Sequence, residues 1–251
     1  VSQPGFDPNL FVDGIDAVNW DAYNNSPDKP LNNRALRGQY PPGSTFKPFM
    51  ALAALELNKR SPSYTISDPG YYMLPGSSHH YRDWKAGGHG SVDLHTSIVI
   101  SCDTYYYGLA VDLGIDNITN FMSHFGFGRK SGIDIEGEQI GVLPSQAWKM
   151  KRFKQKWYTG DTVSVGIGQG YNLATPLQLA VATAALANNG QLMRPRLVHS
   201  VQDSKTGQTR VLAPETRDGW PLKPENLEQV TAAMVDVTRP GGTAGRAGAG
   251  A

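Results

Sequence analysis

The sequence predicts an α+β fold in which helices outnumber strands. Long helical patterns recur along the chain, whereas the predicted strands are few and short. Strands and helices do not alternate as they do in βαβ units, which argues against a parallel sheet. The 251 residues suffice for one large domain or two small ones with a buried core.

The first half of the chain contains one well-marked helix between two irregular segments. Residues 1–40 are polar and predicted to be irregular. A helix is expected from about Ser44 to Leu57, with Ser44 as its capping residue and Pro48 tolerated in its first turn. Residues 61–92 are rich in Gly, Pro, Ser and aromatic residues, so we expect a long structured loop with short strands.

The second half is predicted to be mainly helical. Helices are expected over residues 93–112, 115–125, from Thr175-Pro176 to Asn188-Asn189-Gly190, and 224–237. Residues 162–170 indicate a short strand that breaks into a glycine loop. Pro195–Val201 and Arg210–Leu212 indicate a hairpin, and residues 239–251 a loop.

Composition excludes several classes of protein. The net charge is +1, and without a long charged block nothing indicates nucleic-acid binding. The single cysteine, Cys102, excludes an internal disulfide. No apolar stretch is long enough to span a membrane, and the N-terminus does not resemble a signal peptide. Any membrane anchor or export signal is therefore expected outside this sequence.

Ser44 and Lys47 form the sharpest local signal, within Tyr40-Pro-Pro-Gly-Ser-Thr-Phe-Lys-Pro48. Residues three apart at a helix start lie on one face. A lysine can take the proton of a serine nucleophile if burial lowers its pKa, and a helix N-terminus favours a developing oxyanion. On these residues alone, a capped helix with a surface lysine remains the commoner interpretation.

A second motif and its flanking segments extend this signal. Ser-x-x-Lys, Ser-x-Asn and Lys-Thr-Gly together mark penicillin-binding proteins and serine β-lactamases, and Ser101-Cys102-Asp103 lies downstream of Ser44. The chain resembles class B penicillin-binding proteins over about residues 6–180, above all the elongation-type penicillin-binding protein 2. The similar stretches are Phe6–Val12, Tyr40–Pro48, Tyr81-Arg-Asp-Trp84, Trp157–Asp161, and Gly166–Tyr171 with Thr175-Pro176.

The resemblance implies the penicillin-binding/serine β-lactamase-like transpeptidase fold, a helical subdomain plus an antiparallel sheet. It also implies a peptidoglycan D,D-transpeptidase. Ser44 would attack the penultimate D-Ala carbonyl of a stem peptide, and an amine from another stem peptide would resolve the acyl-enzyme. Lys47 would deprotonate Ser44, Ser101 would relay protons, and the Ser44 backbone N–H would bind the oxyanion. β-Lactam antibiotics would trap the same serine.

The sequence departs from the family pattern at two places. Asp103 stands where most of the wider family has Asn, and an ionised Asp accepts hydrogen bonds but cannot donate them. Lys205-Thr206-Gly207 matches the third motif but lies at the predicted hairpin tip, so we expect a plain turn. Residues 1–251 are therefore expected to be a transpeptidase domain incomplete at the N-terminus. The strand of the third motif, the remaining C-terminal strands and the C-terminal helix are expected to be missing.

Four residues form a candidate metal site, although catalysis itself is expected to need no cofactor. Asp68, Asp83, His89 and Cys102 offer thiolate, imidazole and carboxylate ligands suited to zinc. Their spacing matches no standard zinc signature, but the resemblance implies a structural zinc in this region. The alternative is a buried thiol, two loop-capping carboxylates and a surface histidine.

Other polar features are given structural interpretations. His79-His80 and His95 are expected to be solvated rather than ligands. Lys149–Lys156 is interpreted as a solvated or glycan-proximal segment. Gly166-Ile-Gly-Gln-Gly170 lacks the ending of a phosphate loop, so we expect a turn near the active-site wall.

The resemblance also implies a location and partners. We expect a domain on the periplasmic side of the bacterial inner membrane, with its anchor outside this sequence. Its partners would be peptidoglycan stem peptides, β-lactams and membrane proteins of the elongation machinery, but no nucleic acid. Two alternatives remain: a D,D-carboxypeptidase or class D-like β-lactamase, in which water resolves the acyl-enzyme, and a non-catalytic β-lactam sensor or binding module.

Overall fold

The computed structural model describes residues 2–248, which form helices and short strands. The helices are η1 (Pro8–Phe11), α1 (Ala17–Asn25), α2 (Arg34–Arg37), η2 (Gly43–Phe46), α3 (Lys47–Glu56), α4 (Leu94–Val99), α5 (Asp103–Leu113), α6 (Ile115–Ser123), α7 (Gln146–Phe153), α8 (Thr159–Val165), α9 (Pro176–Ala187) and α10 (Pro224–Val237). The strands are β1 (Ile66–Asp68), β2 (Tyr71–Tyr72), β3 (Tyr81–Arg82), β4 (Gly90–Val92), β5 (Gln191–Met193), β6 (Ser200–Gln202), β7 (Thr209–Val211) and β8 (Thr216–Gly219).

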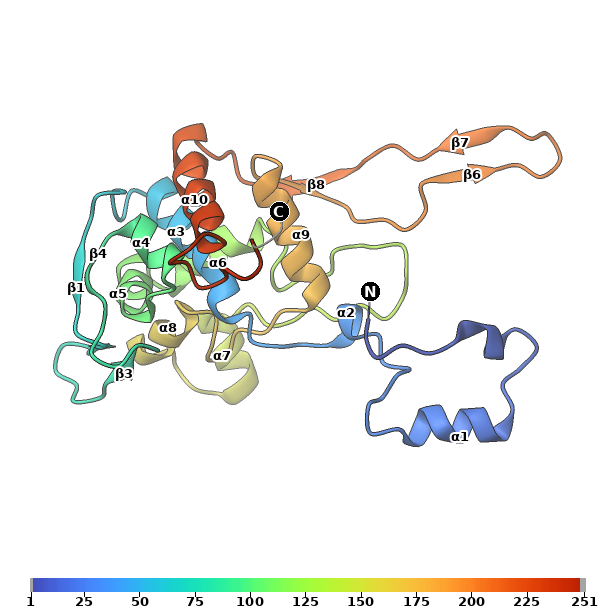
Figure 1. Cartoon of the computed structure of the whole chain (residues 1–251), viewed down its shortest axis with the longest axis horizontal. Helices are drawn as coiled ribbons and strands as arrows, with labels where there is room; N and C mark the ends of the chain where they lie inside the picture. Colours follow the sequence, from blue (N-terminus) through green and yellow to red (C-terminus); the bar gives the residue numbers. More distant parts are fainter. Residues whose placement is uncertain (1, 249–251) are drawn as a thin grey trace.

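Helix α3 lies at the centre of the helical body (Figure 1). Every residue from Phe49 to Leu55 is buried, so this helix is apolar on all faces, as expected for a core helix. Helices α4, α5, α6 and α10 pack around it. The residue that begins α3, Lys47, is therefore carried by the most deeply buried element of the body.

The strands form antiparallel pairs, and the expected α+β architecture is confirmed. β1 pairs with β4, β2 with β3, β5 with β8, and β6 with β7. The first two pairs organise the segment over 61–92, as expected for a loop with short strands. Within residues 2–248, no helix combines the length and apolar composition that a membrane crossing requires.

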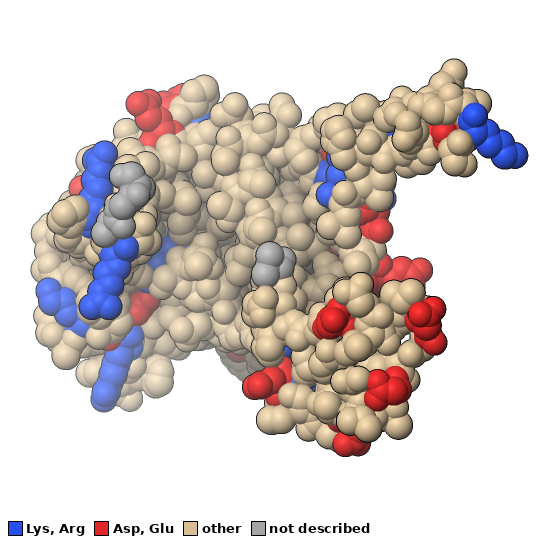
Figure 2. Space-filling model, turned by 45° about the vertical axis from the view of Figure 1, so that its right-hand side comes forward, with Lys and Arg blue, Asp and Glu red and all other residues tan. Residues whose placement is uncertain are grey.

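The N-terminal 40 residues are not irregular throughout, because η1, α1 and α2 lie within them. Asp16 caps α1 by accepting from the backbone N–H groups of Val18 and Asn19. No residue of α1 is buried, so the helix lacks the apolar periodicity that reveals helices in a sequence. The lobe that holds α1 projects from the body in Figure 1, and Figure 2 shows acidic side chains on it.

The predicted helix over 93–112 is broken into α4 and α5. Ser101, in the break, has φ +56°, in the left-handed region that L residues rarely adopt.

The predicted strand at residue 162 is wrong, because Thr159–Val165 is helix α8. Asp161 caps this helix by accepting from the Tyr158 N–H. The apolar face of α8 packs on α5. Tertiary packing overrides the strand preference of its Thr and Val residues.

Other predicted elements are confirmed. Helix α6 lies within the predicted 115–125, α10 coincides with 224–237, and Thr175 begins α9 with a capping box that includes Gln178. The predicted hairpin is β6–β7, which projects from the body in Figure 1. The loop predicted over 239–251 forms turns as far as Gly248, and residues 249–251 lie outside the described part.

Candidate active site

Ser44 lies on a 3-10 turn that precedes the core helix. Residues Gly43–Phe46 form η2, and α3 begins only at Lys47, so Ser44 is not a helix cap and that prediction is wrong. Phe46 is fully buried against Phe127. This anchor leaves the Ser44 side chain exposed at the surface of the body.

Gly168 supports the turn Gly43–Phe46, which carries Ser44. The Gly43 N–H donates to the Gly168 carbonyl at 2.9 Å. Gly168 has φ +69°, and a Cβ there would collide with the carbonyl oxygen of Gly43 and lie 2.8 Å from its nitrogen. The predicted glycine loop therefore packs against Gly43 and Phe46 of the turn that carries Ser44, and only glycine allows this approach.

Three side chains form a continuous hydrogen-bonded path from the nucleophile. Ser101 Oγ lies 2.9 Å from Ser44 Oγ, and Lys47 Nζ lies 3.0 Å from Ser101 Oγ. Lys47 Nζ also donates to the Ser101 carbonyl at 2.8 Å and to Asp103 Oδ1 at 2.6 Å. Ser101 is therefore placed between Ser44 and Lys47, and the break between α4 and α5 brings it there.

Burial lowers the pKa of Lys47 below its ordinary value of 10.5, although the Asp103 carboxylate opposes this shift. The Lys47 amine has partners in both charge states. As an ammonium, it has three N–H donors for the Ser101 carbonyl, Ser101 Oγ and Asp103 Oδ1. As a neutral amine, it keeps two of these donations, and its lone pair accepts from the Ser101 hydroxyl. Lys47 can therefore gain and lose a proton with its partners in place.

The path opens onto a cleft between the helical body and the C-terminal segment. Besides Ser44, Lys47 and Ser101, its wall includes Met234 and Val237 of α10 and Thr243 after it. The Thr243 N–H donates to the Val99 carbonyl at 3.2 Å. Sequence reasoning did not identify this wall, because residues more than 130 positions after Ser101 carry no motif that links them to it.

All four predicted catalytic residues, Ser44, Lys47, Ser101 and Asp103, meet at this site. Lys205-Thr206-Gly207 does not join them: it lies in the turn between β6 and β7, in the hairpin that projects from the body (Figure 1). Asp203 Oδ1 accepts from the backbone N–H groups of Lys205 and Thr206. The expected plain turn is confirmed.

The four candidate metal ligands also meet. One donor atom from each of Asp68, Asp83, His89 and Cys102 lies within 4.8 Å of all the others. His89 Nδ1 lies 2.7 Å from Asp68 Oδ2 and 3.5 Å from Asp83 Oδ1, and Cys102 Sγ lies 3.4 Å from Asp68 Oδ2. The His89 side chain is only 5% exposed, so the alternative of a surface histidine is wrong.

The carboxylates of this group also hold the loop. Asp68 Oδ1 accepts from the Gly70 N–H at 2.7 Å, and Asp83 Oδ2 accepts from the Thr104 N–H at 3.0 Å. The predicted loop-capping role is therefore present in addition to the clustering. His89 Nε2 is buried and has no hydrogen-bond partner among residues 2–248. Burial raises the pKa of the Cys102 thiol.

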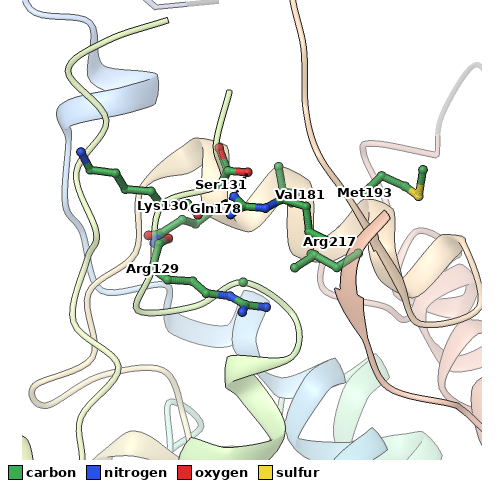
Figure 3. A pocket seen from close by; sticks show the side chains of 9 residues that line it. Arg129, Lys130, Ser131, Gln178, Val181, Met193 and Arg217 are labelled. Carbon is green, nitrogen blue, oxygen red and sulfur yellow. Dashed lines mark hydrogen bonds between the residues drawn. The ribbon is translucent and has the colours of Figure 1, made fainter. Parts of the chain in front are cut away.

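A small cavity away from Ser44 is structural rather than catalytic. Gln178 and Arg217 are among the residues that line it (Figure 3), and both side chains are paired within the protein. Gln178 Nε2 donates at 2.8 Å to the carbonyls of Arg129 and Ile140, and Arg217 Nη1 donates to the Ser131 carbonyl at 2.7 Å. These bonds hold the segment around residues 129–140 against α9 and β8.

Comparison with known proteins identifies the family of the chain. A family model described as the penicillin-binding protein transpeptidase domain matches residues 1–251. The chain belongs to this family. It is 45% identical over 241 residues to the peptidoglycan D,D-transpeptidase MrdA of Acinetobacter baumannii, covering 96% of this chain and 36% of that protein. The chain thus spans about a third of the length of this relative.

Solved structures of the family share the fold. The Pseudomonas aeruginosa PBP2 complex with WCK 5153 has a TM-score of 0.93 and 47% identity, covering all of this chain and 56% of that one. The Helicobacter pylori PBP2–MreC complex has a TM-score of 0.82 and 33% identity, with coverages of 97% and 43%. The imipenem acyl-enzyme of penicillin-binding protein A from Mycobacterium tuberculosis has a TM-score of 0.79 and 26% identity. The match covers 94% of this chain and 53% of that one.

Gly168→Ala is expected to destabilise the protein more than Gly207→Ala. Both glycines have nearly equal positive φ, +69° and +71°, but a Cβ at 207 meets nothing within 4 Å. The shared backbone strain costs about 1–2 kcal/mol, and the collision with Gly43 adds roughly 1–3 kcal/mol. Urea unfolding of both variants measures the difference. Equal losses would contradict the close approach beneath Ser44.

Proposed function

We propose that this chain carries the acylation site of a peptidoglycan D,D-transpeptidase. The observation that carries the proposal is the path Ser44–Ser101–Lys47, with successive contacts of 2.9 and 3.0 Å, beside an open cleft. The family membership and the names of the similar proteins support the reaction class.

In the proposed acylation, Ser44 Oγ attacks the penultimate D-Ala carbonyl of a stem peptide. The Ser44 proton passes to Ser101 Oγ while the Ser101 proton passes to the neutral amine of Lys47. The backbone N–H of Ser44, in the first turn of η2, donates to the developing oxyanion. The C–N bond to the terminal D-Ala then breaks, and its nitrogen takes a proton back through Ser101. An ester on Ser44 remains.

In the proposed second step, an amine of another stem peptide attacks this ester. Its proton leaves through Ser101 to Lys47, and Ser44 Oγ recovers a proton as the C–O bond breaks. One peptide bond replaces another, so no oxidant or reductant is needed. A carboxypeptidase or β-lactamase would share the first step but use water in the second. A sensor would stop after acylation.

The proposed nucleophile is tested by intact mass after incubation with a penicillin. The complete protein is expected to gain one drug mass and keep it, whereas the Ser44→Ala variant gains none, because only Ser44 Oγ can form the ester. Loss of the drug without retained mass would indicate a β-lactamase. A folded protein that gains no mass would contradict the catalytic proposal. Crosslinking of stem peptides by the unmodified protein separates a transpeptidase from a sensor.

The pH dependence of acylation is expected to follow Lys47. Only the neutral amine can accept a proton, so the rate should rise with pH and reach half its maximum below 10.5, since burial lowers the pKa. The Asp103 carboxylate raises this pKa, so Asp103→Asn is expected to move the midpoint to lower pH. Acylation by a fluorescent penicillin at a series of pH values measures both. A midpoint at or above 10.5, or an upward shift in the variant, would contradict this role of Lys47.

We further propose that Asp68, Asp83, His89 and Cys102 bind a structural zinc ion. Four donor atoms of suitable chemistry lie close together, and the buried His89 directs Nδ1 at the carboxylates of Asp68 and Asp83. When bound, zinc would join the loop over 61–92 to Cys102 at the start of α5. It would take no part in the acylation of Ser44. Because burial raises the pKa of the Cys102 thiol, binding must displace its proton.

Zinc binding is tested on the purified protein by metal analysis and thermal unfolding. About one zinc per chain is expected, and a chelator should lower the Tm of the unmodified protein but not that of a Cys102→Ser variant that has lost the metal. His199→Gln, at an exposed histidine outside this group, is the matched control and should retain zinc. Metal-free protein with an unchanged Tm after zinc addition would contradict the proposal.

The proposed setting follows from the longer relatives. We propose that the chain carries transpeptidase-domain sequence of a longer protein of the bacterial inner membrane, on its periplasmic side. Its proposed partners are stem peptides, β-lactams and membrane proteins of the elongation machinery. The H. pylori PBP2–MreC complex supports the last of these.

A further inference from the structure

The Ser101 backbone must be held in an unfavourable conformation for its side chain to reach Ser44. Its φ of +56° is in the left-handed region, where an L residue loses stability unless other contacts compensate. Two backbone bonds join the turn to α4. The Ser101 N–H donates to the Ile98 carbonyl at 3.2 Å, and the Cys102 N–H donates to the Ser97 carbonyl at 3.0 Å. The carbonyls of Ile100 and Ser101, just after α4, accept from other parts of the chain.

Trp84 satisfies those carbonyls. Its indole N–H is shared between the carbonyls of Ile100 and Ser101, each at 3.1 Å. Its backbone N–H donates to Asp103 Oδ2 at 3.2 Å. The residue is 60% exposed, so these bonds, rather than burial of the ring in the core, connect it to the turn. The indole ring also lies against the imidazole of His89, with centroids 5.3 Å apart.

Two of the groups that Trp84 contacts, the Ser101 carbonyl and the Asp103 carboxylate, are also partners of Lys47. The Ser101 carbonyl accepts from Lys47 Nζ as well as from the indole, and Asp103 binds Lys47 through Oδ1 and Trp84 through Oδ2. Trp84 therefore fixes both acceptors between which the Lys47 amine is held. The indole also fixes the turn that aims Ser101 Oγ at Ser44.

We propose that Trp84 is a positioning residue for proton transfer between Ser44 and Lys47, acting through Ser101. This inference rests on the proposed acylation of Ser44. Without the indole N–H, the Ser101 carbonyl keeps only its bond to Lys47 and the Ile100 carbonyl loses its bond to Trp84, so the turn is held less firmly. Ser101 Oγ then spends less time between the other two atoms, which slows proton transfer from Ser44 while the cleft wall stays unchanged.

The test compares two replacements of Trp84 in the complete protein. Trp84→Phe removes the N–H and most of the ring shape, whereas benzothienylalanine at 84 keeps the shape and replaces only the N–H by sulfur. Trp20→Phe is the matched control, because Trp20 is also an exposed tryptophan but lies on α1, in the projecting lobe (Figure 1). Stopped-flow acylation by a penicillin separates the acylation rate constant from the dissociation constant, and titration counts the reactive molecules.

Both Trp84 replacements are expected to lower the acylation rate constant by about tenfold, the upper scale of one lost hydrogen bond. The dissociation constant and the fraction of reactive molecules should stay unchanged, and Trp20→Phe should match the unmodified protein. A rate constant equal to that of the unmodified protein would overturn the inference, as would a fall only in the reactive fraction. Absence of acylation in the unmodified protein would contradict the proposed function itself.

Discussion

The site depends on the burial of one amine. Lys47 Nζ, at the start of the core helix α3, is removed from water, which is unfavourable unless every N–H finds a partner. Its partners are the Ser101 carbonyl, the Ser101 hydroxyl and the Asp103 carboxylate. These groups all lie in or beside the break between α4 and α5. The break therefore completes the hydrogen bonding of Lys47, and burial gives that lysine a lowered pKa.

The same arrangement gives the site its readiness for proton transfer. The partners of Lys47 are the same in its charged and neutral forms, so a proton can move without the surrounding groups rearranging. Such preorganisation is a main source of catalytic power in enzymes. The loop over 61–92 contributes from outside: Asp83 accepts from the Thr104 N–H at the first turn of α5, and Trp84 binds the break. A segment with few core residues thereby helps to determine the geometry of the proton path.

Local sequence signals predicted some elements well and others poorly. Helix α9 was predictable because Thr175, Pro176 and Gln178 form a strong start signal. Helix α8 was not, because its Thr and Val residues favour strands and its helical state depends on packing against α5. Helix α1 was missed because it has no buried face to produce a periodic pattern. The break at Ser101 was missed because a positive φ at a serine has no local sequence signature.

The sequence by itself determined the chemical identity of the site: a serine and a lysine three residues apart, a second serine followed by Cys102 and Asp103, and a set of zinc-competent side chains. These are properties of residue types and short spacings, and longer stretches such as Phe6–Val12 and Trp157–Asp161 add the family resemblance. Tertiary structure alone decided that Ser101 lies between Ser44 and Lys47, that Gly168 supports the nucleophile turn, and that Trp84 holds the break. These contacts join residues from 17 to 125 positions apart, and the one at Ser101 also depends on a strained backbone. No local pattern encodes them, because they form only when the core packs.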